Sequence, residues 1–298
     1  MFLQQVINGL TLGCIYALIA LGYTLIFGII KLINFAQGEV SMVGAYIAVG
    51  VIIILSKFGF LTESLFLSLT FVFLVTVIGC SLLGILVELV AFRPLRNSPS
   101  LSALITSLGV SIFLQNGFML LFGSENKIFP SLFQKLLPLE NTHLSYLQIF
   151  IIVLSLILML LLHLFIKKTK LGKSMRAVSE NKVLSSLMGI NINKTIRSTF
   201  IVASILGGVS GIMLGMYYGV ARYDMGLFPG IKAFTAAILG GIGNVPGAMV
   251  GGVVLGIVES LSAGYISVDY KDIFAFILLI IVLIFKPQGF LGEKVSQE

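Results

Sequence analysis

Residues 167–197 read KKTKLGKSMRAVSENKVLSSLMGININKTIR and form the one long polar stretch of the chain. Eight of the 19 Lys and Arg residues lie here, with a single acid, Glu180. Apolar segments long enough to cross a bilayer flank the stretch on both sides. A basic loop between two spans stays on the cytoplasmic side, because positively charged loops resist translocation. The sequence therefore predicts a multi-span membrane protein with a cytoplasmic loop at 167–197.

Composition agrees with this class. Of the 298 residues, 58% are hydrophobic and 10% charged, and the mean hydropathy is +1.10, which argues against a water-soluble domain. The net charge of +7 equals the surplus of the 167–197 loop, so it indicates topology and no nucleic-acid partner. Cys14 and Cys80 lie inside apolar runs, and the two histidines lie far apart, so we expect no metal site and no cofactor on this chain.

Apolar runs of about 20 residues mark the spans. We predict them near 6–30, 38–56, 64–91, 101–122, 147–166, 198–220 and 273–286. A glycine-rich run at 231–262 is interrupted at 243–247, where Gly and Pro disfavour a regular helix. This run either crosses twice or contains a re-entrant half-helix, and the Lys and Arg distribution favours two passes.

These spans predict an all-α polytopic membrane protein with about 8–9 transmembrane helices, one of them broken or re-entrant. We expect residues 1–298 to form a single transmembrane domain. Between the fourth and fifth spans, the loop 123–146 is predicted to be extracytoplasmic and to form a small helix or cap.

Glycines at four-residue spacing predict close helix packing, because small residues let helix backbones approach. Two such rows occur, and they consist of Gly207, Gly211, Gly215 and Gly219, and of Gly243, Gly247 and Gly251.

A few polar groups lie in or near the spans. Asn34, Gln37 and Ser41 would share one face of a helix, while Glu39 lies off that face. A carboxylate in the membrane costs about a few kcal/mol unless it is paired or hydrated. These residues therefore fit either a solvated turn or, together with Asn244 in the broken run, the lining of a translocation path.

Other charged residues support structural interpretations. Glu88 is expected to pair with Arg93 near the membrane surface, and Glu259 to lie at the interface. Leu171–Ser174 reads LGKS, which resembles the end of a phosphate-binding loop, but its first glycine and preceding strand are missing. No pairing of a nucleophile with a base is apparent, so we expect a non-catalytic protein.

Several segments closely resemble the LivH-type permease of branched-chain amino-acid ABC importers. They are NGLTLGCIYALIALGYTLIFGIIKLINFAQGEV (8–40), SMVGAY (41–46), AFRPLRNSPSLSALITSLGVSIFLQN (91–116), SSLMGIN (185–191), GIKAFTAAILGGIGNVPGAMVGG (230–252) and YKDIFAFILLIIVLIFKPQGFLG (270–292). The resemblance covers nearly the whole chain and is weakest at 123–146.

The resemblance implies a membrane subunit of an ATP-driven importer for leucine, isoleucine, valine or related amino acids. It would lie in the bacterial cytoplasmic (inner) membrane, surrounded by lipid, beside a second, LivM-like permease. Two ATPase subunits, with ATP and magnesium, would bind the cytosolic side, and an extracytoplasmic amino-acid-binding protein would deliver substrate. The ATPase-coupling positions would be Arg176, Ala177, Glu180, Gly189 and Ile190.

Alternatives stay open on the residues alone. An ion-gradient-driven secondary transporter of small amino acids or amides would also contain broken helices. A membrane scaffold without transport activity is a second alternative. The basic loop itself could bind anionic lipid.

Overall fold

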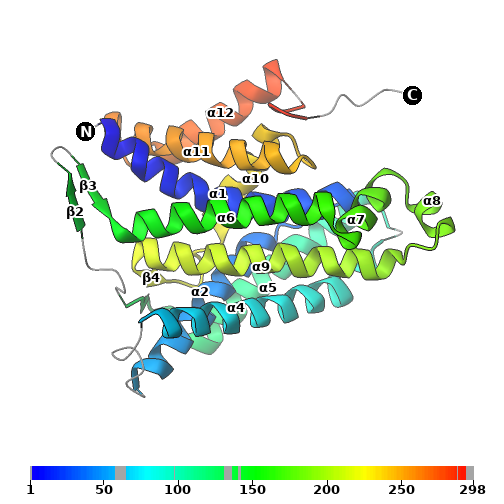
Figure 1. Cartoon of the computed structure of the whole chain (residues 1–298), viewed down its shortest axis with the longest axis horizontal. Helices are drawn as coiled ribbons and strands as arrows, with labels where there is room; N and C mark the ends of the chain where they lie inside the picture. Colours follow the sequence, from blue (N-terminus) through cyan, green and yellow to red (C-terminus); the bar gives the residue numbers. More distant parts are fainter. Residues whose placement is uncertain are drawn as a thin grey trace. The chain divides into compact units, whose positions relative to one another are not determined.

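The computed structural model describes residues 2–57, 65–96, 98–130, 136–139, 142–286 and 288–292. Helices dominate these residues (Figure 1). The helices are α1 (Phe2–Ile30), α2 (Gln37–Lys57), α4 (Leu65–Val87) continued by the π-helix η1 (Glu88–Phe92), α5 (Ser100–Phe122), α6 (Tyr146–Lys168), α7 (Lys170–Glu180), α8 (Lys182–Leu187), α9 (Ile192–Tyr218), α10 (Leu227–Gly240), α11 (Val245–Tyr265) and α12 (Lys271–Phe285). Four short strands complete the described elements: β1 (Lys127–Ile128), β2 (Leu136–Leu139), β3 (Thr142–Ser145) and β4 (Val220–Ala221).

Seven of the described helices are long and apolar enough to cross a membrane. Six of them, α1, α2, α4 with η1, α5, α6 and α9, match predicted spans, and the seventh is α11. The predicted span at 273–286 is α12, whose 15 residues extend only about 22 Å against the ~30 Å of a hydrocarbon core. The predicted all-α polytopic membrane fold is confirmed.

The glycine-rich run is broken, as predicted. α10 has 14 residues and ends at Gly240, and α11 begins at Val245. Gly241 and Gly243 adopt φ values of 102° and 97° in the turn, a left-handed conformation that glycine tolerates. Since 14 residues of helix extend about 21 Å, the length of α10 favours the re-entrant form over a full crossing.

The chain forms two compact units. The first comprises residues 1–31, 135–199 and 231–298, and the second comprises 32–134 and 200–230. The division falls inside α9 and inside α10, so neither unit is a separate stretch of chain. The single transmembrane domain over 1–298 stays a prediction.

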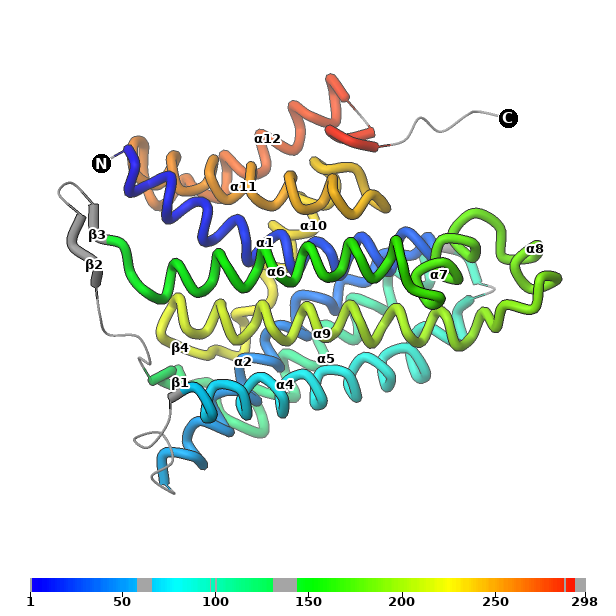
Figure 2. Tube along the Cα trace, in the orientation of Figure 1, coloured from blue at the N-terminus to red at the C-terminus, as the bar shows by residue number. Residues whose placement is uncertain are grey.

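In the first unit, α1 packs along α11 and also contacts α6 (Figure 2). Small residues bring α1 and α11 together. A Cβ atom added at Gly13 would lie 2.8 Å from Val253 Cα, and one added at Gly252 would lie 2.5 Å from Ala17 Cα. Backbones this close gain dispersion contacts. These contacts stabilise helix association in a membrane, where the hydrophobic effect does not drive helices together.

Replacing Gly13 by Leu is expected to prevent accumulation of the chain in the membrane, because the new side chain meets the α11 backbone. The matched control is Gly109→Leu, since an added Cβ at that membrane-helix glycine meets no atom within 4 Å. Immunoblotting of membranes measures both variants. Equal amounts of the two would contradict the packing argument.

In the second unit, α2 contacts α4 and α5 and also packs against the part of α9 that follows Thr199. A Cβ at Gly44 would lie 2.6 Å from Gly208 Cα. On α9, Gly207 faces Gln37 and Val40, and Gly211 faces Ser41. The glycine row of α9 thus brings α2 close.

Not every glycine in the two predicted rows packs a helix. Gly215 meets Phe129 and Ala45, whereas Gly219 follows the last residue of α9 with φ 71° and has no neighbour within 4 Å of an added Cβ. Gly243 is likewise a turn residue. Gly247 and Gly251 face Gly240 and Ala236, so they pack α11 against α10. The four-residue spacing therefore includes Gly219 and Gly243, which lie outside the helices. At these two positions the positive φ value, and not helix packing, explains the glycine.

The loop 123–146 forms strands where the sequence predicted a helix or cap. β1 pairs antiparallel with β4, and β2 pairs with β3 in a hairpin. Residues 131–135 and 140–141 lie outside the described part. Pairing with the distant Val220–Ala221 segment satisfies the backbone of Lys127 and Ile128, and no local sequence pattern signals it.

Candidate functional site

The basic loop 167–197, which is predicted to be cytoplasmic, contains α7, a helix of the first unit. Thr169 caps the helix, because its hydroxyl accepts a hydrogen bond from the Gly172 N–H at 3.0 Å. Gly172, Met175 and Val178 form the buried face, and α7 contacts α6 and α1. Leu171–Ser174 lies within this helix, so the LGKS string forms no phosphate-binding loop.

α8 differs, because it presents apolar side chains to solvent. Val183 is 70% exposed, Leu184 57%, Leu187 79% and Met188 82%. These four residues form what we call the α8 apolar face. α8 lies beyond the end of α6 and contacts α7 (Figure 1). An exposed apolar cluster of this kind is typical of a surface that binds a protein or a membrane.

The end of α8 is held by a Schellman motif. The Gly189 N–H donates to Ser186 O and the Ile190 N–H donates to Ser185 O, both at 3.0 Å. Gly189 has φ 80°, a left-handed conformation. Glycine adopts it without the strain that a Cβ introduces.

Replacing Gly189 by Val is expected to destabilise the end of α8 by about 1–2 kcal/mol, because L-residues resist left-handed φ values. In the importer that the sequence resemblance implies, uptake measured in membrane vesicles should fall. Gly189→Asn is the control, since asparagine tolerates this conformation, and it should retain most of the uptake. Equal activity of the two variants would contradict this role for the Schellman motif.

The residues predicted to couple to an ATPase lie on either side of α8. Arg176, Ala177 and Glu180 belong to α7, where Arg176 donates to Lys167 O at 3.3 Å. Gly189 and Ile190 follow α8. The α8 apolar face between the two groups was missed, although the apolar pairs 183–184 and 187–188 in a basic loop signal it.

The predicted polar path residues Asn34, Gln37, Glu39 and Ser41 gather at the start of α2 in the second unit, and all are buried. Asn34 is not on the helical face shared by Gln37 and Ser41. It precedes α2, and its Oδ1 accepts from the Ala36 N–H at 3.1 Å. The correction has a simple reason, because asparagine readily folds back on its own backbone in a turn.

Gln37 and Glu39 each leave one oxygen without a partner. Gln37 Nε2 donates to Ala203 O at 2.8 Å, and the Ser111 hydroxyl contacts Glu39 Oε1 at 3.3 Å. Among the residues that the structure describes, Gln37 Oε1 and Glu39 Oε2 have no hydrogen-bond partner. Glu39 is 1% exposed. A carboxylate so completely removed from water is unsuited to a solvated turn.

Asn244 belongs to the first unit, and its side chain forms hydrogen bonds with backbone groups. Its Oδ1 accepts from the Gly247 N–H at 3.1 Å, which caps α11, and its Nδ2 donates to Leu291 O at 2.8 Å. Both ends of the amide are therefore engaged in structure. The path-lining role of Asn244 stays a prediction.

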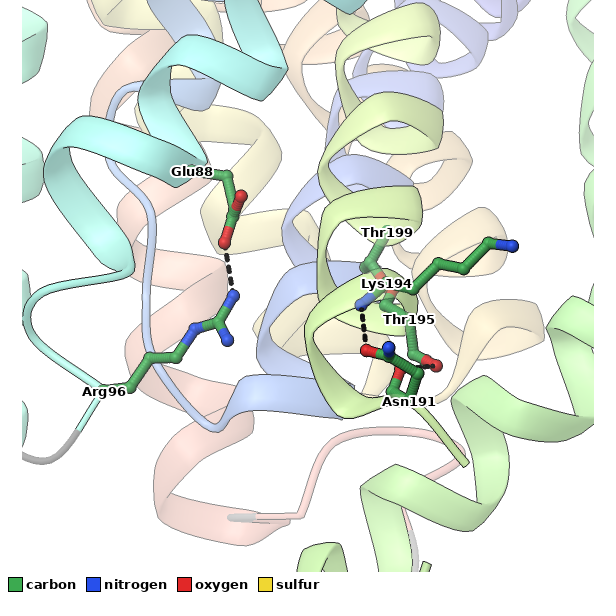
Figure 3. A network of polar contacts seen from close by, with 6 residues as sticks. All are labelled: Glu88, Arg96, Asn191, Lys194, Thr195 and Thr199. Carbon is green, nitrogen blue, oxygen red and sulfur yellow. Dashed lines mark hydrogen bonds and ion pairs between the residues drawn. The ribbon is translucent and has the colours of Figure 1, made fainter. Parts of the chain in front are cut away.

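Glu88 pairs with Arg96, not with Arg93 (Figure 3). Glu88 is buried, whereas Arg93 is exposed. The backbone N–H of Arg93 closes the π-helical turn by donating to Glu88 O at 2.7 Å. The same figure shows Asn191, whose Oδ1 caps α9 by accepting from the Lys194 N–H at 3.0 Å.

Three charged residues meet inside the first unit. Lys232 Nζ on α10 lies 2.6 Å from Glu259 Oε1 on α11 and 2.6 Å from Asp272 Oδ1 on α12. It also lies 5.8 Å from the centre of the Tyr16 ring on α1. Glu259 is 2% exposed, so it does not lie at an interface with water as the sequence suggested. This charged triad was missed because Lys232 lies 27 residues before Glu259, and a single sequence does not show which helices pack together.

Comparison with known proteins gives consistent matches. The family model of the branched-chain amino acid transport system permease component matches residues 5–283. The high-affinity branched-chain amino acid transport system permease protein BraD of Pseudomonas aeruginosa is 45% identical over 98% of this chain and 96% of its own length. LivH of Escherichia coli is 44% identical over 98% and 96%. A probable LivH of Methanocaldococcus jannaschii is 30% identical over 92% and 88%. No solved structure matches the chain.

Proposed function

Since the chain belongs to the permease component family of branched-chain amino acid transport systems, we propose that it forms part of the membrane path of an ATP-driven importer for leucine, isoleucine and valine. The relatives and the seven apolar helices make it a multi-pass protein of the bacterial inner membrane. It is a permease component, and the ATP hydrolysis that drives it takes place on separate chains. A LivM-like permease and an extracytoplasmic binding protein complete the proposed complex.

The observation that carries the link to ATP is the α8 apolar face. Its four side chains project from a basic loop, and the excess of lysine and arginine there favours a cytosolic position. A groove on an ATPase subunit would cover them and gain the free energy of apolar burial. With α7 packed on α6 and α1, a displacement of α8 reaches the spans through a folded helix. Nucleotide-driven closure of two ATPases would then reorient those spans.

The anionic-lipid alternative fits the loop less well. Lipid headgroups attract lysine and arginine, which α7 provides on its exposed face. They do not account for four apolar side chains that lie outside the spans. Protein docking accounts for both features, because interfaces combine an apolar centre with a charged rim.

Mass spectrometry of the proteins that co-purify with this chain in mild detergent tests the proposal. Two ATPase chains and a second permease are the expected partners. Reproducible recovery of the folded chain alone would overturn the proposal and favour an ion-gradient-driven transporter.

A further inference from the structure

The start of α2 meets the start of α10 inside the second unit. A Cβ added at Gly38 would lie 2.5 Å from Gly226 O and 2.9 Å from Gly230 Cα. A Cβ added at Gly226, the residue before α10, would lie 2.6 Å from Gly38 O. No side chain separates the two helix ends. The N-terminus of each helix carries a partial positive charge, which favours an anionic group.

This meeting point lies at the middle of a span. Gln37 bonds to Ala203 O at 2.8 Å, and Gly44 packs on Gly208. Both partners are near the centre of α9, which runs from Ile192 to Tyr218. Helices that begin at mid-membrane are the usual place where transporters hold a substrate.

Two buried oxygens at the start of α2 have no partner among the described residues, and one of them faces this point. Glu39 Oε2 lies 2.7 Å from the position of a Cβ at Gly226, so the carboxylate points to the start of α10. Gln37 Oε1 is also unsatisfied, and Gln37 is fully buried. Arg222 is not available to Glu39, because it donates to both oxygens of Asp224 at 2.9 and 2.7 Å. The described residues thus leave a dry carboxylate without a cation, which is unfavourable until a positively charged ligand arrives.

We propose that Glu39 and Gln37 receive the α-ammonium group of the amino acid in transit, while the first turns of α2 and α10 receive its carboxylate. This assignment rests on the proposed transport function and specifies its substrate as a zwitterion. Amides and urea lack both charges, so they would leave Glu39 unpaired. In the present conformation the contact between Gly38 and Gly226 closes the site, and substrate enters when the two backbones separate.

The test uses the assembled transporter in proteoliposomes with ATP enclosed. Glu39→Gln keeps the shape of the side chain and removes its charge. Leucine uptake should fall about tenfold or more, which is the effect of losing a charged hydrogen bond. Thr76→Val is the matched control, because Thr76 is another fully buried residue of this unit whose hydroxyl has no partner in the described structure. It should retain uptake within about twofold, since no ligand is assigned to it.

A second readout does not depend on transport. Ser111→Cys, in a background with Cys14 and Cys80 replaced by Ala, places a thiol beside Glu39. A cationic methanethiosulfonate should label it about tenfold faster than an anionic one, because the carboxylate attracts the cation. Adding Glu39→Gln should remove this preference, and leucine should slow the labelling.

The outcomes separate the two claims. If the unmodified complex shows no leucine uptake, the proposed function fails and the labelling still decides the role of Glu39. Normal uptake by Glu39→Gln would overturn the ammonium site and leave the transport function standing. The labelling is measured during ATP-driven turnover, when the two backbones separate, and equal labelling by the two reagents, or labelling by neither, would then also overturn the site.

Discussion

Lys232→Met is expected to abolish accumulation of the folded protein. The substitution leaves Glu259 buried and without its cation, and breaking a buried ion pair in this way costs about 3–5 kcal/mol. Asp272 loses the same partner but is 36% exposed, so water or headgroups replace part of the interaction. Because Lys232 joins α10 to α11 and α12, its loss removes the ion pairs that help to hold a helix of only 14 residues. Size-exclusion chromatography of the solubilised complex, together with membrane immunoblots, measures the effect.

Two further variants separate charge from shape at this triad. Lys232→Arg keeps the cation and should accumulate better than Lys232→Met. The double variant Lys232→Met with Glu259→Gln removes both members of the buried pair and should recover part of the lost protein, since no charge is then left uncompensated there. If the double variant loses as much protein as Lys232→Met and Glu259→Gln lose in sum, the two residues do not stabilise the fold as a pair.

The pair Leu187→Ser and Met188→Ser is expected to abolish ATP-driven uptake without lowering the amount of the chain in the membrane. Both side chains are about four-fifths exposed, at 79% and 82%, so the fold of this chain does not depend on them. In the proposed complex an ATPase covers them, and each buried side chain of this size contributes about 1.5–3 kcal/mol. Losing both therefore weakens association by a factor on the order of a hundred or more.

The matched control exchanges the two residues, as Leu187→Met with Met188→Leu. It keeps the apolar area and should retain uptake and ATPase co-purification. Pull-down followed by immunoblotting for the ATPase chains distinguishes the variants. Normal association of the serine variant would show that the α8 apolar face is not the docking surface.

The sequence predicted the spans well, because hydrophobic length is a local property. Six of the predicted spans coincide with apolar helices, and the break near Gly243 was visible from Gly and Pro. The short length of α12 was harder to foresee. It begins at Lys271 and ends before Lys286, and a run of apolar residues does not by itself tell a full span from a shorter helix.

Contacts between pairs of side chains were harder to predict from the sequence. Glu88 was assigned to Arg93 by proximity in sequence, whereas its partner in the structure is Arg96. Asn244 was predicted to line a path; its capping of α11 was not foreseen, and the path role stays a prediction. The triad of Lys232 depends on three helices meeting, which no periodicity encodes. The sequence thus shows which polar residues of a membrane protein are unusual, but only the packed helices show which residues they pair with.

Leucine uptake by proteoliposomes is the most direct test of the central claim that this chain is the permease of an ATP-driven importer. Vesicles contain the purified complex, with its binding protein on the face opposite α8. The account predicts accumulation only when ATP is present on the α8 side, and none when the permease is reconstituted alone. Accumulation by the chain alone, without ATP and in response to an imposed proton or sodium gradient, would contradict it.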